Sequence, residues 1–225
     1  MTTNFNNNIQ KYTPEQIEQY TESYEFLRRG ISRVSWSSLD EYLLARDIEN
    51  EVEHGFPIDF VPPGATERLL EQCQKVFSPA TTTKLIEVGA DVDAVNAKGE
   101  TALIMEARLS RWTKVIEAIL PRTKKINAKD NNGHTAFYYL YREYLSCRSG
   151  YIDDRDIANG KKIWKQIHLL LDAGADPVIN TWTGCHAERR HKPQVVLQLK
   201  KRIVTYLQQR EEMKTKTESG YDYEL

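Results

Sequence analysis

Two short patterns recur along this chain of 225 residues, and the recurrence constrains the fold more than any other feature. The segments 98–103 (KGETAL) and 132–137 (NGHTAF) align, and their glycines stand 34 residues apart. The segments 85–94 (LIEVGADVDA) and 170–177 (LLDAGADP) align as well. Self-similarity at a period of roughly 20–50 residues is typical of repeat proteins, in which each unit packs only on its neighbours. We therefore expect a stack of similar units.

Each residue type in these patterns has a local structural role. Gly99 and Gly133 stand where a tight turn needs a left-handed backbone, which glycine adopts without strain. Thr101 and Thr135 follow them, where a hydroxyl can accept a hydrogen bond from the first turn of a helix. The glycines of the second pattern fall just past a helix end, a position that favours the same left-handed backbone. These are Gly89 and Gly174.

Together the two patterns resemble the ankyrin repeat, whose unit of about 33 residues holds a β-turn and two antiparallel helices. The resemblance extends over roughly residues 61–204 and is best over 84–137 and 167–177. It implies an all-α fold: an ankyrin-repeat solenoid of helix-turn-helix units with short β-turn fingers and an N-terminal helical cap. It also implies about three to four repeats between degenerate N- and C-terminal caps, because terminal units have one face toward water.

The chain is expected to divide into four segments. Thr13 and Pro14 indicate a helix start, and Gly30 is expected to end that helix. The polar stretch from residue 211 has no apolar period and is expected to be disordered. The segments are a disordered N-terminus (1–12), a helical region with a degenerate capping repeat (13–60), the repeats with an insertion near 147–160 (61–207), and a polar C-terminal tail (208–225).

The charge of the chain is balanced overall but uneven along its length. Lys and Arg number 31 against 32 Asp and Glu, which argues against a general nucleic-acid binder, since such proteins carry a large positive excess. Residues 1–100 hold 17 acids and 9 bases, a net charge of −8, and residues 101–225 hold 15 acids and 22 bases, a net charge of +7. Runs of acids at 40–53 and of bases at 189–202 are interpreted as solvated faces, with an acidic protein or a nucleic acid as the alternative partner of the basic run. The charge asymmetry of the chain is able to orient a charged partner.

Other features bear on the compartment. No apolar run approaches the roughly 18–20 residues that span a bilayer, and the N-terminus lacks the pattern of a secretory signal. Cys73, Cys147 and Cys185 are too few for a disulfide scaffold, so a reducing compartment is the default. We expect a cytoplasmic protein, in its own cell or in a host cell, with no membrane partner.

No pattern in the sequence indicates catalysis. Cys185, His186 and His191 lack the second ligand pair of a zinc site. The acids at 153–156 lack the glycine and the terminal Glu of a calcium loop, and no glycine-rich phosphate loop follows a strand. The sequence therefore predicts no metal, no cofactor and no enzymatic activity.

The resemblance implies a protein-binding role, because ankyrin stacks bind other proteins through their finger tips and the concave faces of their first helices. An exposed Trp182 would be a typical interface anchor, as would Tyr151 in the insertion. Carried onto this chain, the expected partner-binding residues are Lys98, Glu100, Arg108 and Arg111 in the second repeat (about 95–128), Lys129, Asn131, Asn132, His134, Tyr138 and Arg142 in the third repeat (about 129–179), Trp182 and Thr183 in the fourth repeat (about 180–207), and Tyr151 and Ile152 in the insertion.

Five aromatic residues crowd one helix of the third repeat. Phe137 matches a buried position of the repeat pattern. The tyrosines cannot all lie on one buried stripe of a helix, so one or two are expected to face the concave groove, with core packing the role of most. They are Tyr138, Tyr139, Tyr141 and Tyr144.

Three functional hypotheses follow. The first is an adaptor or inhibitor that binds and occludes one protein target, as an effector, an immunity protein or a defence antagonist of bacterial, phage or viral type. The second is a nucleic-acid-associated protein that uses the basic C-terminal half, which a steep salt dependence of binding would reveal. The third is an enzyme with a site on the N-terminal helices or the insertion, which would need a cluster of titratable groups in a closed pocket.

Overall fold

The computed structural model describes residues 10–33, 38–76, 78–147, 154–177 and 193–218. Within these ranges the regular structure consists of helices alone, so the all-α class is confirmed. The chain forms two compact units, Met1–Tyr139 and Leu140–Leu225.

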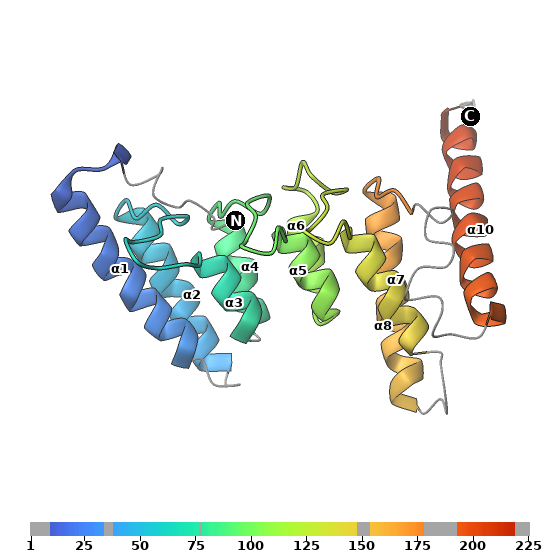
Figure 1. Ribbon diagram of the computed structural model, residues 1–225, viewed down its shortest axis with the longest axis horizontal. Coiled ribbons are helices and arrows are strands. Elements are labelled where there is room, and N and C mark those ends of the chain that lie inside the picture. Colours follow the sequence, from blue (N-terminus) through green and yellow to red (C-terminus); the bar gives the residue numbers. More distant parts are fainter. Residues whose placement is uncertain (1–9, 34–37, 77, 148–153, 178–192, 219–225) are drawn as a thin grey trace, which may run out of the picture. The chain divides into compact units, whose positions relative to one another are not determined.

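Six helices of the first unit form two layers (Figure 1). Within each layer, every helix packs on the next helix of that layer. Between the layers, consecutive helices of the chain pack in pairs: the first on the second, the third on the fourth, and the fifth on the sixth. The unit is therefore a row of helix pairs. The side chains between the layers are aliphatic and fully buried, among them Leu27, Leu69, Leu85 and Ile116. One layer holds α1 (Pro14–Arg33), α3 (Leu69–Val76) and α5 (Ala102–Leu109), and the other holds α2 (Ser38–Glu53), α4 (Pro79–Glu87) and α6 (Thr113–Ile119).

The first helix begins where the sequence predicts and continues further. The Thr13 hydroxyl accepts a hydrogen bond from the Gln16 N–H at 3.2 Å, and the Gln16 side chain accepts one from the Thr13 N–H at 3.0 Å, a reciprocal cap. The prediction that Gly30 ends the helix is wrong, because α1 runs to Arg33. A Cβ at Gly30 would lie 2.6 Å from Leu44 Cδ1, so this glycine serves close packing of α2 on α1.

Part of the segment expected to be disordered, residues 1–12, is packed. Tyr12 makes edge contacts with Tyr20 and Phe60, at ring-centroid distances of 5.4 and 5.7 Å. Tyr20 in turn contacts Phe56 and Phe60. Such edge-to-face aromatic pairs add to the stabilisation from burial, which explains why the chain is ordered before α1 begins.

The predicted helix caps are confirmed by threonine side chains at two helix starts and by glycine backbone angles at two helix ends. The Thr101 hydroxyl accepts a hydrogen bond from the Ile104 N–H, and the Thr135 hydroxyl accepts one from the Tyr138 N–H. Gly89 and Gly174 have φ of +104° and +93°. In both places the glycine N–H bonds the carbonyl three residues back, and the next N–H bonds the carbonyl five residues back, which is the Schellman motif. Gly55 ends α2 with the same two hydrogen bonds.

The second unit allows a matched test of this backbone role. Gly174→Ala is expected to lower the free energy of unfolding by about 1–2 kcal/mol, because an L-residue in a left-handed conformation is strained. Gly160→Ala is expected to raise it by about 0.5–1 kcal/mol, since Gly160 lies inside a helix with nothing within 4 Å of the added Cβ. Thermal unfolding followed by circular dichroism measures both, and shifts of the same sign would contradict the assignment.

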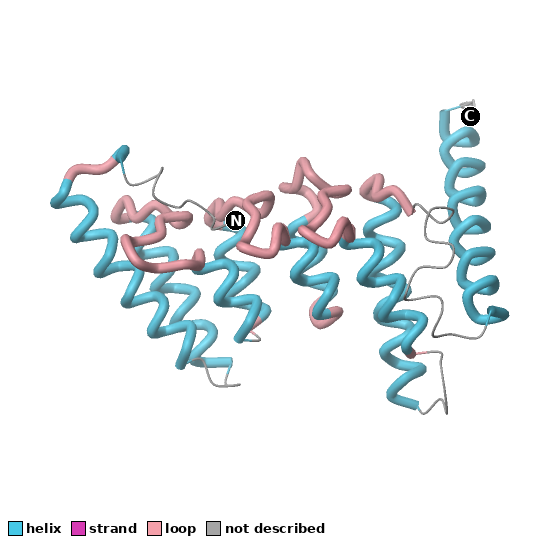
Figure 2. The backbone as a smooth tube through the Cα atoms, viewed as in Figure 1, coloured by secondary structure: helices cyan, strands magenta, loops and turns pink. Residues whose placement is uncertain are grey.

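Most loops of the first unit run along one edge of its helices (Figure 2). Carboxylates join neighbouring loops there. Asp59 accepts hydrogen bonds from the Asp91 N–H at 3.1 and 3.0 Å, 32 residues further on. Asp93 accepts one from the Lys124 N–H at 2.7 Å, 31 residues further on. Burial raises the pKa of Asp59, and the Asp91 N–H opposes that shift. Each loop is therefore fixed by the preceding one.

The remaining described helices are α7 (Ala136–Ser146), α8 (Asp154–Asp172) and α10 (Pro193–Glu218). The stretch from residue 211, expected to be disordered, is helical as far as Glu218, where the Lys214–Glu211 pair at 3.5 Å supports the helix. Residues 154–160 of the expected insertion belong to α8, so that helix absorbs part of the extra length.

Among the described residues, no helix is both long enough and apolar enough to cross a bilayer.

Candidate functional site

Two turns in the loops of the first unit have the same geometry. In the first finger turn, residues 96–100, the Asn96 N–H bonds the Glu100 carbonyl at 3.0 Å and the Gly99 N–H bonds the Asn96 carbonyl at 2.9 Å. The Asn96 side-chain oxygen also accepts from the N–H groups of Lys98 and Glu100, at 2.8 and 3.0 Å. Gly99 has a φ of +74°, as the sequence predicts.

The second finger turn, residues 130–134, repeats this pattern 34 residues later. The Asp130 N–H bonds the His134 carbonyl at 3.0 Å, and the Gly133 N–H bonds the Asp130 carbonyl at 2.9 Å. The Asp130 carboxylate accepts from the N–H groups of Asn132 and His134, at 2.8 and 2.9 Å. Gly133 has a φ of +77°, so the two turns match in backbone and in side-chain support.

The two finger turns contact each other directly. The Asn131 N–H bonds the Lys98 carbonyl at 2.9 Å, and the Asn131 side-chain amide bonds the Ala97 carbonyl at 3.1 Å. A Cβ at Gly99 would lie 2.5 Å from Asn131 Oδ1, so only glycine permits this approach. The predicted binding residues Lys98, Lys129, Asn131 and Asn132 are exposed at these tips.

Glu100 lies beneath the first tip rather than on it. It is 4% exposed, and its carboxylate binds Arg108 Nε at 2.6 Å and the Asn96 amide at 2.9 Å. The Arg108 side chain keeps 31% of its surface exposed. Glu100 therefore positions Arg108 and the turn, while Arg108 is the member of this pair that a partner can reach.

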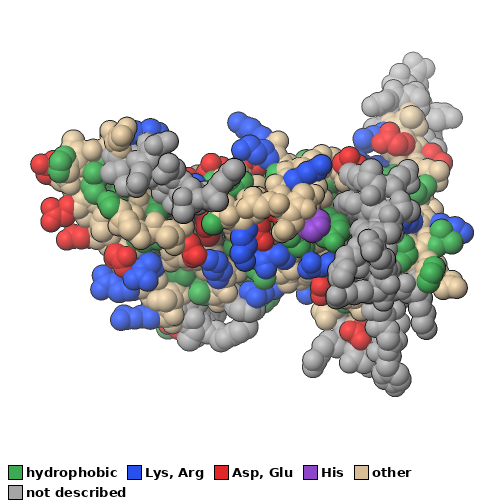
Figure 3. Space-filling view, in the orientation of Figure 1, with side chains coloured by type: hydrophobic (Ala, Val, Ile, Leu, Met, Phe, Trp, Pro, Cys, Tyr) green, Lys and Arg blue, Asp and Glu red, His purple; other side chains and the backbone are tan. Residues whose placement is uncertain are grey.

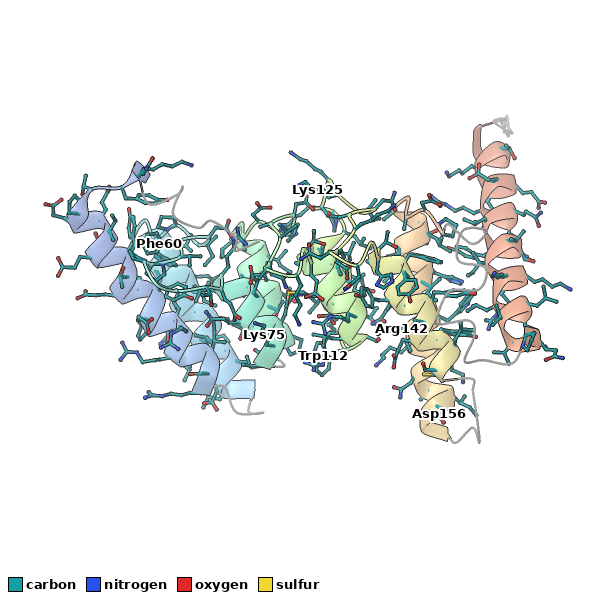
Figure 4. The ribbon with its side chains drawn as sticks, in the orientation of Figure 1. Phe60, Lys75, Trp112, Lys125, Arg142 and Asp156 are labelled. Carbon is teal, nitrogen blue, oxygen red and sulfur yellow. The ribbon has the colours of Figure 1, made fainter. Side chains whose placement is uncertain are left out.

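Arg111 follows α5 and is half-buried. Burial lowers the pKa of Arg111, and the nearby Glu106 carboxylate opposes that shift by favouring the charged guanidinium. Glu106 is 2% exposed and accepts a hydrogen bond from the Trp112 N–H at 2.7 Å, at the start of α6. Trp112 lies at the end of the α5–α6 pair opposite Lys125, which extends from the loops (Figure 4).

The expectation that one or two tyrosines of α7 face an open groove is wrong. Tyr138, Tyr139, Tyr141 and Tyr144 are each at most 5% exposed. The His134 ring stacks on Tyr138 with centroids 3.9 Å apart, and the Tyr139 hydroxyl donates to Asp130 at 2.5 Å. Asp130 and Arg202 bind the phenol groups of Tyr139 and Tyr144, which helps the helix to bury tyrosines beyond one stripe. His134 remains partly exposed and covers Tyr138.

The other predicted binding residues lie in the second unit or outside the described structure. Arg142 is half-buried on α7. The remaining four, Tyr151, Ile152, Trp182 and Thr183, lie outside the described residues, as do Cys185, His186 and His191.

A groove between α1 and α3 is a feature that the sequence did not predict. Its volume is about 710 Å³, and residues of α1, of α3 and of the preceding loop line it. Tyr24 forms part of its wall: the hydroxyl donates to the Glu67 carbonyl at 2.6 Å and accepts from the Gln72 amide at 2.6 Å. Burial raises the pKa of Tyr24 to about 12. Tyr24 is separated from Glu67 by 43 positions and from Gln72 by 48 positions. No local sequence pattern could therefore reveal the groove.

The cations near this groove are paired with acids. Arg28 bonds Glu25 at 2.7 Å, Arg68 bonds Glu71 at 3.0 Å, and Lys75 bonds Glu67. The space-filling view likewise shows both basic and acidic side chains on one face of the protein (Figure 3). Locally balanced charge favours a partner with mixed charge over a polyanion, whose affinity depends on unpaired cations.

The described cysteines and acids form no reactive or metal-binding group. Cys73 is fully buried, and burial raises the pKa of its thiol, which keeps it unreactive. No group of three or more His, Cys, Asp or Glu side chains in the described ranges could hold a metal ion.

Neither a family model nor a curated protein sequence matches this chain. The repeated residues and the geometry of the two finger turns are therefore the basis for a functional conclusion.

Proposed function

We propose that this chain is an ankyrin-type repeat protein that binds a specific protein target through its finger turns and the neighbouring layer of α1, α3 and α5. We propose that binding inhibits or sequesters the target, in the role of an effector, an immunity protein or a defence antagonist. The observation that carries the proposal is the pair of finger turns, which repeat after 34 residues with the same hydrogen bonds.

The rigidity of the tips supports a binding role. Each turn is held by its own Asn or Asp side chain, and Asn131 ties the second turn to the first. Groups that are ordered before the partner arrives lose little conformational entropy on binding, so a preorganised surface gains affinity. A rigid surface that lies over a partner's active site or docking site changes that partner's activity by occlusion.

The chemistry of the tips also suits a protein surface. Lys98 and Lys129 are exposed, and Arg108 lies half-exposed beside the first turn. Arginine is enriched in protein interfaces because its planar guanidinium both packs and donates hydrogen bonds.

Reversal of the two tip charges tests the proposal. The double variant Lys98→Glu and Lys129→Glu is expected to weaken capture of the target at least about tenfold, because unmatched charges in an interface cost several kcal/mol. The measurement is affinity capture from nuclease-treated native lysate, quantified by mass spectrometry, with the unfolding temperature of each variant as a check on the fold.

The matched control is Lys114→Glu, which reverses an exposed lysine on α6 in the other layer. It is expected to leave capture within about twofold of the unsubstituted protein. Equal losses in the two variants, or no loss in the tip variant, would contradict the proposed surface. Retention of nucleic acid alone would favour the nucleic-acid hypothesis instead.

A further inference from the structure

The second unit contains a pocket whose lining includes no residue of the finger turns. It lies between α8 and α10 and has a volume of about 330 Å³. Two aromatic side chains and one histidine line it, namely Trp164 and His168 from α8 and Tyr206 from α10. The pocket is therefore built from residues about 40 positions apart, wholly within the unit Leu140–Leu225.

The aromatic rings of the pocket pack closely on one another. The His168 ring stacks on Tyr206 with centroids 3.8 Å apart, and Trp164 contacts His168 edge-on at 4.6 Å. The guanidinium of Arg202 lies over the Trp164 ring, 4.2 Å from its centroid. These faces are already occupied, so little ring surface is left for a nucleobase to stack on.

The fully charged side chains in the described lining of the pocket are both basic. Lys201 and Arg202 line it, and its described lining contains no Asp or Glu. In the described part of the chain Lys201 makes no ion pair, and Nε2 of His168 is buried with no hydrogen-bond partner. Hydrogen bonds from charged donors such as Lys201 and Arg202 are the stronger ones, so the two cations favour an anionic ligand.

Asp172 is an acid close to the pocket, and it is already engaged. Asp172 accepts a hydrogen bond from the Tyr206 hydroxyl at 2.7 Å and lies 3.6 Å from Arg210 Nε. Burial lowers the pKa of His168, an effect that Asp172 opposes and Arg202 assists. The carboxylate of Asp172 therefore does not neutralise Lys201, and the pocket keeps an excess of positive charge.

We propose that the pocket between α8 and α10 binds a carboxylate side chain from an acidic segment of a protein partner. The carboxylate would accept hydrogen bonds from Lys201 and from Arg202, which also stacks on Trp164. The site is separate from the finger turns, so it goes beyond the function proposed above and does not depend on it.

The probe is a synthetic peptide, acetyl-Glu-Glu-Leu-Glu-Glu-amide, titrated into the full chain and followed by two-dimensional amide and histidine NMR. We expect shifts confined to α8 and α10 resonances, including the His168 ring, and no comparable shifts with the matched Gln peptide. Lys201→Gln is expected to weaken binding about tenfold or more, since hydrogen bonds to charged groups are strong. Lys201 is exposed, so the variant keeps the fold.

Lys214→Gln is the matched control, since it removes the same charge from α10 outside the pocket lining. Binding by this variant within about twofold of the unsubstituted chain supports the site. Three results would overturn it: no pocket shifts at millimolar peptide, equal weakening in the two variants, or a single-stranded oligonucleotide that produces the same shifts at lower concentration. The Lys98→Glu and Lys129→Glu variant should bind the peptide normally, so failure here is distinguishable from failure of the finger surface.

Discussion

Replacement of Asp130 by alanine is expected to lower the free energy of unfolding by about 3 kcal/mol. The carboxylate is 6% exposed and accepts three hydrogen bonds, from the N–H groups of Asn132 and His134 and from the hydroxyl of Tyr139. The alanine variant removes the acceptor from all three, and the buried Tyr139 hydroxyl carries the largest penalty because it loses a charged partner. Urea unfolding followed by circular dichroism measures the change.

Asp130→Asn is the matched control, because the chain itself places Asn96 at the equivalent position of the first finger turn. Asn96 accepts from two backbone N–H groups just as Asp130 does. The asparagine variant should therefore keep the turn and lose only about 1 kcal/mol, through the weaker bond with Tyr139. If alanine and asparagine destabilise equally, the turn does not depend on the side-chain acceptor.

The same carboxylate gives the stability a defined pH dependence. Burial raises the pKa of Asp130, but the Tyr139 hydroxyl and the His134 and Asn132 N–H groups outweigh burial, so the pKa lies below the ordinary value of 3.8. In the unfolded chain the group regains its ordinary value. Its contribution is therefore complete above about pH 4 and is lost as the pH falls through the folded-state pKa. The stability difference between Asp130 and Asp130→Asn should shrink in that range and stay constant from pH 5 to 7.

Features set by a few neighbouring residues could be predicted from the sequence. Gly89 and Gly174 end helices, and Thr101 caps one, because these roles depend on backbone geometry within a single turn. The helical start at Pro14 is predictable for the same reason. The class of fold follows, since repeated turn and cap signals leave only helices between them.

Features that depend on distant contacts could not be predicted. Gly30 continues α1 because Leu44, on another helix, packs against it. Glu100 matches a tip position of the repeat pattern, yet Arg108 and Asn96 hold its carboxylate beneath the turn. A local pattern gives the position of a residue along a turn, whereas burial depends on which partners the fold brings to it.

Both pockets illustrate the same limit on prediction from sequence. The α1–α3 groove depends on Tyr24 reaching Glu67. The α8–α10 pocket depends on Arg202, whose hydrogen-bond partner Tyr144 precedes it by 58 residues. The sequence shows a basic run at 189–202 but not that Arg202 is engaged with aromatic residues, nor that the adjacent Lys201 is exposed with no ion pair to any described residue.

Arg202→Ala should have the second large effect. We expect it to lower the free energy that holds α10 against α7 and α8 by about 2–3 kcal/mol. The guanidinium donates a hydrogen bond to the Tyr144 hydroxyl and lies over Trp164. Tyr144 is 4% exposed, so its hydroxyl would be left buried without this donor. The cation–π contact with Trp164 contributes a further ~0.5–2 kcal/mol.

Hydrogen exchange of the α10 amides measures this loss locally. A change of about 2–3 kcal/mol corresponds to roughly 30–150-fold faster exchange from α10, with the first unit unchanged. Arg202→Lys should give an α10 exchange rate between those of the unsubstituted protein and Arg202→Ala, because lysine keeps the charge but lacks the planar group that stacks on Trp164. Lys201→Ala, one residue away and exposed, should alter exchange by less than about twofold. If Lys201→Ala and Arg202→Ala accelerate exchange equally, the general positive charge of α10 holds it in place, rather than the stacked guanidinium.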